Sequence, residues 1–197
     1  MSDELPQRNG ESFSGTGWRR QLLEYVLTFV VAFALVFGFI KPALADSYRI
    51  PSSSMEPTLH GCEGCNNDRV MANKFTYRFT EPERGQIVVV RSVEDDDTLL
   101  IKRVVGVPGD RLRLRDGILF LNGEPQKEPY VHANPCHKYV PKTCAFGPVT
   151  VPRGRVFLMG DNRAVSHDSR FFGAVPEKNV EGEAILRYWP PGRIGLL

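Results

Sequence analysis

The apolar run from Leu22 to Ile40 constrains this chain more than any other feature. Apart from Glu24 near its start, the run contains no charged residue. As a helix that rises about 1.5 Å per residue, it would be about 28 Å long, close to the hydrocarbon thickness of a bilayer. A helix that is apolar on all sides is rarely buried in a protein of only 197 residues. The run therefore predicts a transmembrane anchor over residues 21–41.

A cleaved signal peptide is the alternative interpretation of this run. Arg19 and Arg20 form a basic flank, and Ala43-Leu44-Ala45 has the small-x-small form of a cleavage site. The run is longer than the apolar region of a typical signal peptide, which favours a retained anchor. The basic residues before the run favour a cytoplasmic N-terminus, so the polar residues 1–20 predict a disordered cytoplasmic arm.

The remainder of the chain is predicted to be mainly β, because most of the chain's 18 glycines and 15 prolines lie there and interrupt it at short intervals. A short helix is expected only around residues 176–180, where a proline can occupy the first turn. The expected strands are β-branched or alternating runs that form antiparallel hairpins. They cover residues 85–91, 99–106, 111–115, 118–121, 156–159 and 184–189.

A change in composition divides this β region. Five prolines interrupt residues 124–150, which predicts a small inserted, Pro-rich β subdomain over residues 114–151. The core of antiparallel sheet then comprises residues 46–113 and 152–197. The balance of 25 Lys and Arg against 23 Asp and Glu leaves a net charge of +2. This balance argues against nucleic acid as a partner, because nucleic-acid-binding domains usually carry a strongly basic face.

The serines between Pro51 and Pro57 lie just beyond the apolar run. Such a segment is usually a solvated turn. Its position near a membrane suggests instead a hydroxyl group that meets membrane-borne substrates. Lys102 offers a matching base, since it lies in a strand that is apolar on both sides. Such a lysine usually faces solvent, but if it points inward, burial lowers its pKa and the neutral amine can activate a serine.

A third polar segment, residues 160–170, is denser in functional groups than a typical strand connection. As a simple polar turn, it would contain a surface ion pair between Asp168 and Arg170, which would contribute little stability. A triad of Ser54, His167 and Asp168 is disfavoured, because adjacent His and Asp residues cannot easily adopt the geometry of base and orienting group.

Residues 50–59, 102–110 and 160–170 closely resemble, in order, the conserved boxes of bacterial type I signal peptidases, the leader peptidases of peptidase family S26. The resemblance implies a membrane-anchored serine endopeptidase that removes N-terminal signal peptides from exported preproteins. It implies a Ser–Lys dyad that works through an acyl-enzyme, with no cofactor and no metal. It also implies a single-pass protein of the bacterial inner membrane, with its catalytic β domain on the extracytoplasmic side.

The resemblance also assigns roles to individual residues. Ser54 matches the nucleophile and Lys102 the general base. Ser52 matches the residue whose hydroxyl forms the oxyanion hole together with the backbone N–H of Ser54. Ser166 matches the serine that hydrogen-bonds and orients the lysine.

The remaining assignments concern the surroundings of the dyad. Asp168 and Arg170 match a supporting ion pair, and Met55 would line the substrate cleft. The family box commonly has Asp-Asn where this chain has Ala164-Val165. This departure predicts local repacking rather than a loss of chemistry.

The expected partners are membrane lipid and preproteins with small residues before the cleavage site. An extended peptide can add as a strand to a sheet edge and place alternate side chains in shallow pockets. Because Ala43-Leu44-Ala45 has the same small-x-small form, self-cleavage there is a hypothesis.

The four cysteines form two local pairs, Cys62 with Cys65 and Cys136 with Cys144. The neighbouring His60 and His137 keep a zinc site open as an interpretation. Oxidising conditions outside the membrane favour disulfides, and Cys136–Cys144 corresponds to a region where some family members have one. Cys62 and Cys65 could form a strained disulfide, a redox pair or a link between loops.

Two other functions remain as alternatives. A self-processing Ser–Lys protease of the repressor type would share the chemistry, but it would be soluble and carry a DNA-binding module. A non-enzymatic anchored metal or redox module would use the cysteines and leave Ser54 and Lys102 incidental.

Overall fold

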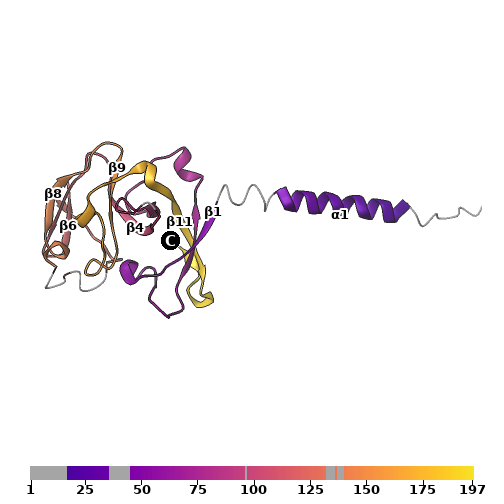
Figure 1. Cartoon of the computed structure of the whole chain (residues 1–197). Coiled ribbons are helices and arrows are strands. Elements are labelled where there is room, and N and C mark those ends of the chain that lie inside the picture. The colour runs from indigo at the N-terminus through magenta and orange to yellow at the C-terminus, as the bar shows by residue number, and fades with distance from the viewer. Residues whose placement is uncertain (1–16, 36–44, 96, 132–135, 137–139) are drawn as a thin grey trace, which may run out of the picture. The chain divides into compact units, whose positions relative to one another are not determined.

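The computed structural model describes residues 17–35, 45–95, 97–131, 136 and 140–197 (Figure 1). It divides into two compact units, Met1–Pro42 and Ala43–Leu197. The predicted arm over residues 1–20 lies mostly outside the described residues, as do Ala43 and Leu44 of the hypothetical self-cleavage site.

Helix α1 (Gly17–Leu35) is the only element described in the first unit. Among the described residues, no helix combines the length and apolar character that crossing a membrane requires. The predicted transmembrane helix over residues 21–41 is therefore not found. Helix α1 begins four residues earlier and includes the charged Arg19, Arg20 and Glu24, while residues 36–41 lie outside the description.

The second unit is mainly β, as predicted, and its larger sheet has eight strands. Their order is β1-β2-β11-β3-β4-β9-β10, with β12 paired to β11, and every pairing is antiparallel. The strands are β1 (Ala45–Arg49), β2 (Arg69–Asn73), β3 (Ile87–Arg91), β4 (Leu99–Gly106), β9 (Arg155–Met159), β10 (Val175–Pro176), β11 (Val180–Trp189) and β12 (Gly195–Leu196).

A second sheet of four antiparallel strands has the order β7-β6-β5-β8. Its strands are β5 (Arg111–Arg115), β6 (Ile118–Leu121), β7 (Glu124–Pro125) and β8 (Phe146–Thr150). The sheet begins three residues before the predicted insertion, at Arg111, which pairs with Thr150 of β8. Leu112 and Leu114 are buried on the same face of β5. Both leucines pack with Phe157 and Met159 of β9, so the two sheets share one apolar core.

The remaining helical elements are short. Helix α3 (Ser169–Phe172) was not expected, whereas a 3-10 turn at Glu177–Asn179 occupies the place of the predicted helix. Further 3-10 turns lie at Ser53–Met55, Thr76–Arg78, Pro141–Thr143 and Pro191–Arg193.

Strands β3 and β4 explain how charged residues become buried in this fold. Ile87 to Val90 are all buried, which requires apolar packing on both faces of β3. One face contributes Ile87 to a cluster with Met55 and Leu59, and the other contributes Val88 and Val90 to a second cluster. Because the neighbouring strand β4 is also covered on both faces, its adjacent Lys102 and Arg103 are both buried.

Candidate active site

The segment of residues 50–59, which contains the predicted nucleophile Ser54, lies between β1 and β2. Ser54 lies in the 3-10 turn, and the side chains of Met55 and Leu59 are buried beneath it. Asn162 donates its backbone N–H to Ser54 O at 3.1 Å and its Nδ2 to Ser53 O at 3.2 Å. These contacts fix the serine backbone against the polar segment that follows β9.

Lys102 reaches this serine from the middle of β4. Its Nζ donates to Ser54 Oγ at 2.9 Å and to the carbonyl oxygen of Ile101 at 3.1 Å. Only 4% of the residue is exposed. This burial lowers the pKa of Lys102 to about 8, although the negative charges of Asp168 and Asp161 act in the opposite direction.

The other two predicted serines lie on either side of this pair in the sequence but differ in their contacts. Ser52 Oγ donates to Ser54 Oγ at 3.3 Å. Ser166 is buried, and its Oγ has no hydrogen-bond partner among the described residues. The expected hydrogen bond between Ser166 and Lys102 is therefore not present in this structure, where the amine contacts Ser54 and the Ile101 carbonyl oxygen.

Gly160 explains how Ser166 still comes close to Ser54. A Cβ atom at Gly160 would lie 2.4 Å from Ser166 Oγ and 2.4 Å from Ser54 O. The backbone thus passes between these two serines, where only glycine fits. The Gly160 N–H also donates to Asp168 Oδ2 at 3.0 Å.

Asp168 and Arg170 form the predicted supporting ion pair. Arg170 Nε donates to Asp168 Oδ1 at 2.8 Å, and both side chains are fully buried. The neighbouring His167 is instead 59% exposed, with Nε2 at 2.9 Å from Glu94 Oε2. This arrangement gives no support to a triad with Ser54.

A second buried ion pair, between Arg103 and Asp161, was not assigned a role from the sequence. Arg103 Nε and Nη2 donate to Asp161 at 2.8 and 2.7 Å, and Thr58 Oγ1 donates to the same carboxylate at 2.5 Å. The Arg103 guanidinium also lies 4.0 Å from the centre of the Tyr130 ring. The signal in the sequence was an arginine next to Lys102 in an otherwise apolar strand.

The departure at Ala164-Val165 leaves the nearby charge network intact. Val165 is 56% exposed, so this position of the box faces solvent. The preceding Arg163 is fully buried and binds Glu128 through two hydrogen bonds of 2.9 and 2.6 Å. The predicted local repacking at these two positions stays a prediction.

A cleft of about 240 Å³ opens beside Ser54 and Lys102. It is lined by these two residues, by Met55, and by residues from the end of β1 and from β3 and β4. Apolar side chains such as Ile50, Val89 and Leu100 form much of its wall. Met55, which the resemblance assigned to a substrate cleft, is thus one of the residues that line this cleft.

Both cysteine pairs are disulfides in the structure. The Cα atoms are 5.5 Å apart in Cys62–Cys65 and 4.9 Å apart in Cys136–Cys144, within the usual range. Each disulfide closes its own short loop. His137, the second histidine considered for a metal site, lies outside the described residues.

Replacing Asp161 by Asn is expected to lower the free energy of unfolding by about 3–5 kcal/mol, because the buried Arg103 charge loses its partner. Urea unfolding of the two proteins measures this change. Asp116→Asn is the matched control, because the exposed pair with Arg115 contributes about 0–1 kcal/mol. Equal stability of the Asp161→Asn variant and the wild type would show that this pair does not stabilise the fold.

Comparison with known proteins places this site in a family. The family model described as "Signal peptidase, peptidase S26" matches residues 22–189. A Synechocystis protein named "Probable signal peptidase I-2" is 40% identical over 180 residues, which cover 89% of this chain and 77% of that protein.

Two further relatives carry similar names. Signal peptidase I of Mycobacterium tuberculosis is 38% identical, with 91% of this chain and 76% of the relative covered. Signal peptidase IB of Staphylococcus aureus is 34% identical, with 87% and 92% covered. The match includes all three polar segments that meet around Ser54 and Lys102. The chain belongs to the S26 family of signal peptidases.

Proposed function

We propose that this protein is a membrane-associated serine endopeptidase that cleaves N-terminal signal peptides from exported preproteins with a Ser54–Lys102 dyad. The observation that carries the proposal is the 2.9 Å contact between Ser54 Oγ and the amine of a buried lysine. A pKa of about 8 allows a useful fraction of Lys102 to be neutral near physiological pH.

The first chemical step is acylation of Ser54. Neutral Lys102 accepts the hydroxyl proton while Ser54 Oγ attacks the carbonyl carbon of the scissile bond. The Ser54 N–H and the Ser52 hydroxyl stabilise the oxyanion of the tetrahedral intermediate. Lys102 then gives the proton to the departing amine of the mature protein, which leaves the signal peptide as an ester on Ser54.

The second step releases the signal peptide. Lys102, neutral again, accepts a proton from a water molecule that attacks the ester carbonyl. The collapse of the second intermediate returns the proton to Ser54 Oγ. The ion pair of Asp168 and Arg170 supports both steps, because Asp168 holds the Gly160 backbone next to the nucleophile.

The cleft supports a substrate with small side chains before the scissile bond. An extended peptide that adds beside a strand edge would place alternate side chains in this cleft of about 240 Å³. The buried Met55 and the surrounding strand residues limit its depth. The proposed substrates are preproteins with a small-x-small sequence before the cleavage site.

The proposed location is the bacterial cytoplasmic membrane, with the N-terminus in the cytoplasm and the catalytic unit on the outer side. The apolar sequence from Leu22 to Ile40 supports attachment to lipid, as do exposed apolar side chains of α1 such as Leu23 and Phe29. The two disulfides favour an oxidising compartment.

Cleavage of a purified preprotein by the full-length protein in detergent micelles tests this function. We expect the mass of the product to equal that of the mature protein, with the cut after a small-x-small sequence. A substrate with a large side chain directly before the scissile bond serves as the control and should remain intact. A preprotein that stays uncut, or is cut within its mature region, would contradict the proposal.

A further inference from the structure

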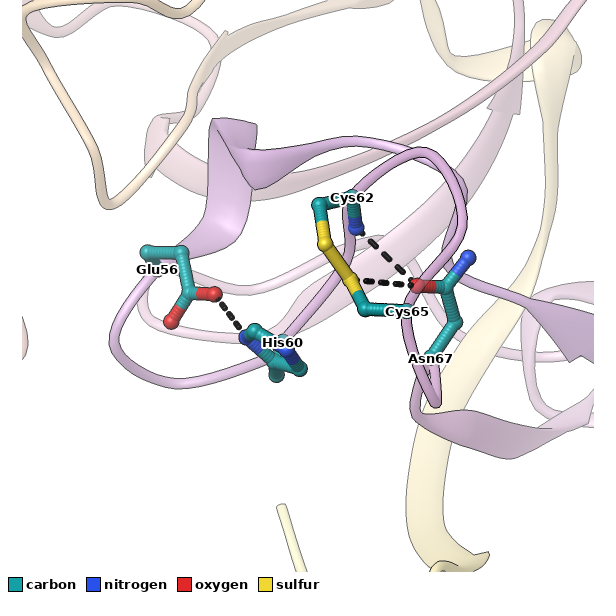
Figure 2. Close-up of a disulfide and its surroundings, with 5 residues drawn as sticks. All are labelled: Glu56, His60, Cys62, Cys65 and Asn67. Carbon is teal, nitrogen blue, oxygen red and sulfur yellow. Dashed lines mark hydrogen bonds and ion pairs between the residues drawn. A yellow bond between two sulfur atoms is a disulfide. The ribbon is translucent and has the colours of Figure 1, made fainter.

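The loop over residues 60–68, which leads into β2, carries potential metal ligands that the proposed mechanism does not use. One ring nitrogen of His60 and the sulfur atoms of Cys62 and Cys65 all lie within 4.8 Å of one another (Figure 2). Imidazole nitrogen and thiolate sulfur are the preferred ligands of Zn²⁺, and Cys-x-x-Cys is a usual spacing for two of them. We propose that reduction of the Cys62–Cys65 disulfide opens a Zn²⁺ site formed by His60, Cys62 and Cys65.

The orientation of His60 supports this assignment. Its Nδ1 is in contact with the carboxylate of Glu56, which Figure 2 shows facing the ring. A carboxylate that holds one ring nitrogen fixes the tautomer, leaves the other nitrogen available and makes it a better ligand. Glu56 thus has the position of an outer partner in a carboxylate–histidine–zinc arrangement.

The loop is held in place by contacts other than the disulfide. The His60 N–H donates to Asp68 Oδ2 at 2.8 Å, and the Asp68 N–H donates to His60 O at 2.9 Å. Asp68 is completely buried, so its side of both bonds is shielded from water. The Cys62 N–H donates to Asn67 Oδ1 at 3.0 Å (Figure 2). Because these bonds do not depend on the sulfur atoms, the ligands stay near one another after reduction.

The site is also open enough for a reductant and a cation to enter. The His60 side chain is 41% exposed, and both cysteines are half-buried. The three protein ligands leave one position of a tetrahedral Zn²⁺ ion for a water molecule. Because the loop is partly exposed, a water molecule from solvent can occupy that position.

The chemistry has two balanced steps. A dithiol reductant gives two electrons and two protons to the disulfide, so that the S–S bond breaks, Cys62 and Cys65 become thiols, and the reductant becomes a cyclic disulfide. Binding of Zn²⁺ then forms two Zn–S bonds and releases both thiol protons to solvent. Zinc and the disulfide therefore exclude each other.

Cobalt titration of the full-length protein in detergent micelles tests the site. A trialkylphosphine reduces both disulfides and becomes a phosphine oxide whose oxygen comes from water. We expect reduced wild type to bind about one equivalent of Co²⁺ with thiolate-to-cobalt absorption, and Zn²⁺ to displace it. The oxidised protein and the Cys62→Ser/Cys65→Ser variant should show none, whereas Cys136→Ser/Cys144→Ser, the matched control, should bind as wild type does.

Single variants separate ligand from outer partner. His60→Gln removes a ligand at an exposed side chain and should abolish tight binding, while Glu56→Gln should weaken it by about 10–100-fold. Circular dichroism checks that each variant is folded. Absence of the absorption from reduced wild type, or unchanged affinity in His60→Gln, would overturn the proposal. Preprotein cleavage by the oxidised protein is measured separately. A failure to bind metal is therefore distinct from a failure of the proposed peptidase function.

Discussion

Replacing Lys102 by methionine is expected to lower kcat/KM for preprotein cleavage by at least about 10⁴-fold, because Ser54 loses its general base. Methionine retains much of the apolar volume of the lysine stem, so the buried position stays filled. Activity is measured with the full-length protein in detergent micelles. The expected loss is therefore chemical rather than structural.

The pH dependence of the wild type gives this prediction a second readout. Only the neutral amine can accept the serine proton, so kcat/KM should rise tenfold per pH unit on the acidic side and level off above the pKa of about 8. This rise of kcat/KM with pH should be absent from any residual activity of Lys102→Met. A wild-type profile in which kcat/KM levels off near the pKa of a histidine would indicate a different base.

Lys178→Met is the matched control, because Lys178 lies exposed in the 3-10 turn at Glu177–Asn179, and its replacement should leave both rate and pH profile unchanged. Full activity of Lys102→Met would remove the dyad from the mechanism.

The lowered pKa of Lys102 also makes the free energy of unfolding depend on pH. The unfolded chain keeps the proton of Lys102 up to about pH 10.5, whereas the folded protein loses it near pH 8. Between these values the unfolded state binds more protons, so the contribution of Lys102 to stability increases with pH. The pH optimum for activity and this contribution to stability therefore both lie on the alkaline side.

The central part of the fold could be predicted from the sequence because its strands are local and strongly patterned. Strands β4, β5 and β6 have the predicted bounds, and β3 pairs with β4 as expected. Strands β1 and β2 were not expected, since Ala45–Arg49 and Arg69–Asn73 mix polar and apolar residues without a clear period. Their pairing is decided by long-range contact with each other and with β11.

The pair of Ser54 and Lys102 was predictable from the order of the motifs, but the buried ion pair of Arg103 and Asp161 beside it was not. Nothing local in the sequence shows that both Lys102 and Arg103 are buried, because alternation along a strand places one of two neighbours on an exposed face. That rule fails here since β4 is covered on both faces. The partner of Arg103, Asp161, lies 58 positions further along the chain, and only the fold brings them together.

Comparing Ser54→Ala with Ser53→Ala in preprotein cleavage is the direct test of the Ser54–Lys102 dyad. Ser54 accepts a hydrogen bond from Lys102, whereas the adjacent Ser53 is exposed and contributes its backbone carbonyl to the loop contact. Removing the nucleophile should lower kcat on the order of 10⁶-fold, because no acyl-enzyme can form, while Ser53→Ala should retain wild-type activity. Cleavage by Ser54→Ala at the wild-type rate would contradict the dyad, and with it the mechanism proposed for this chain.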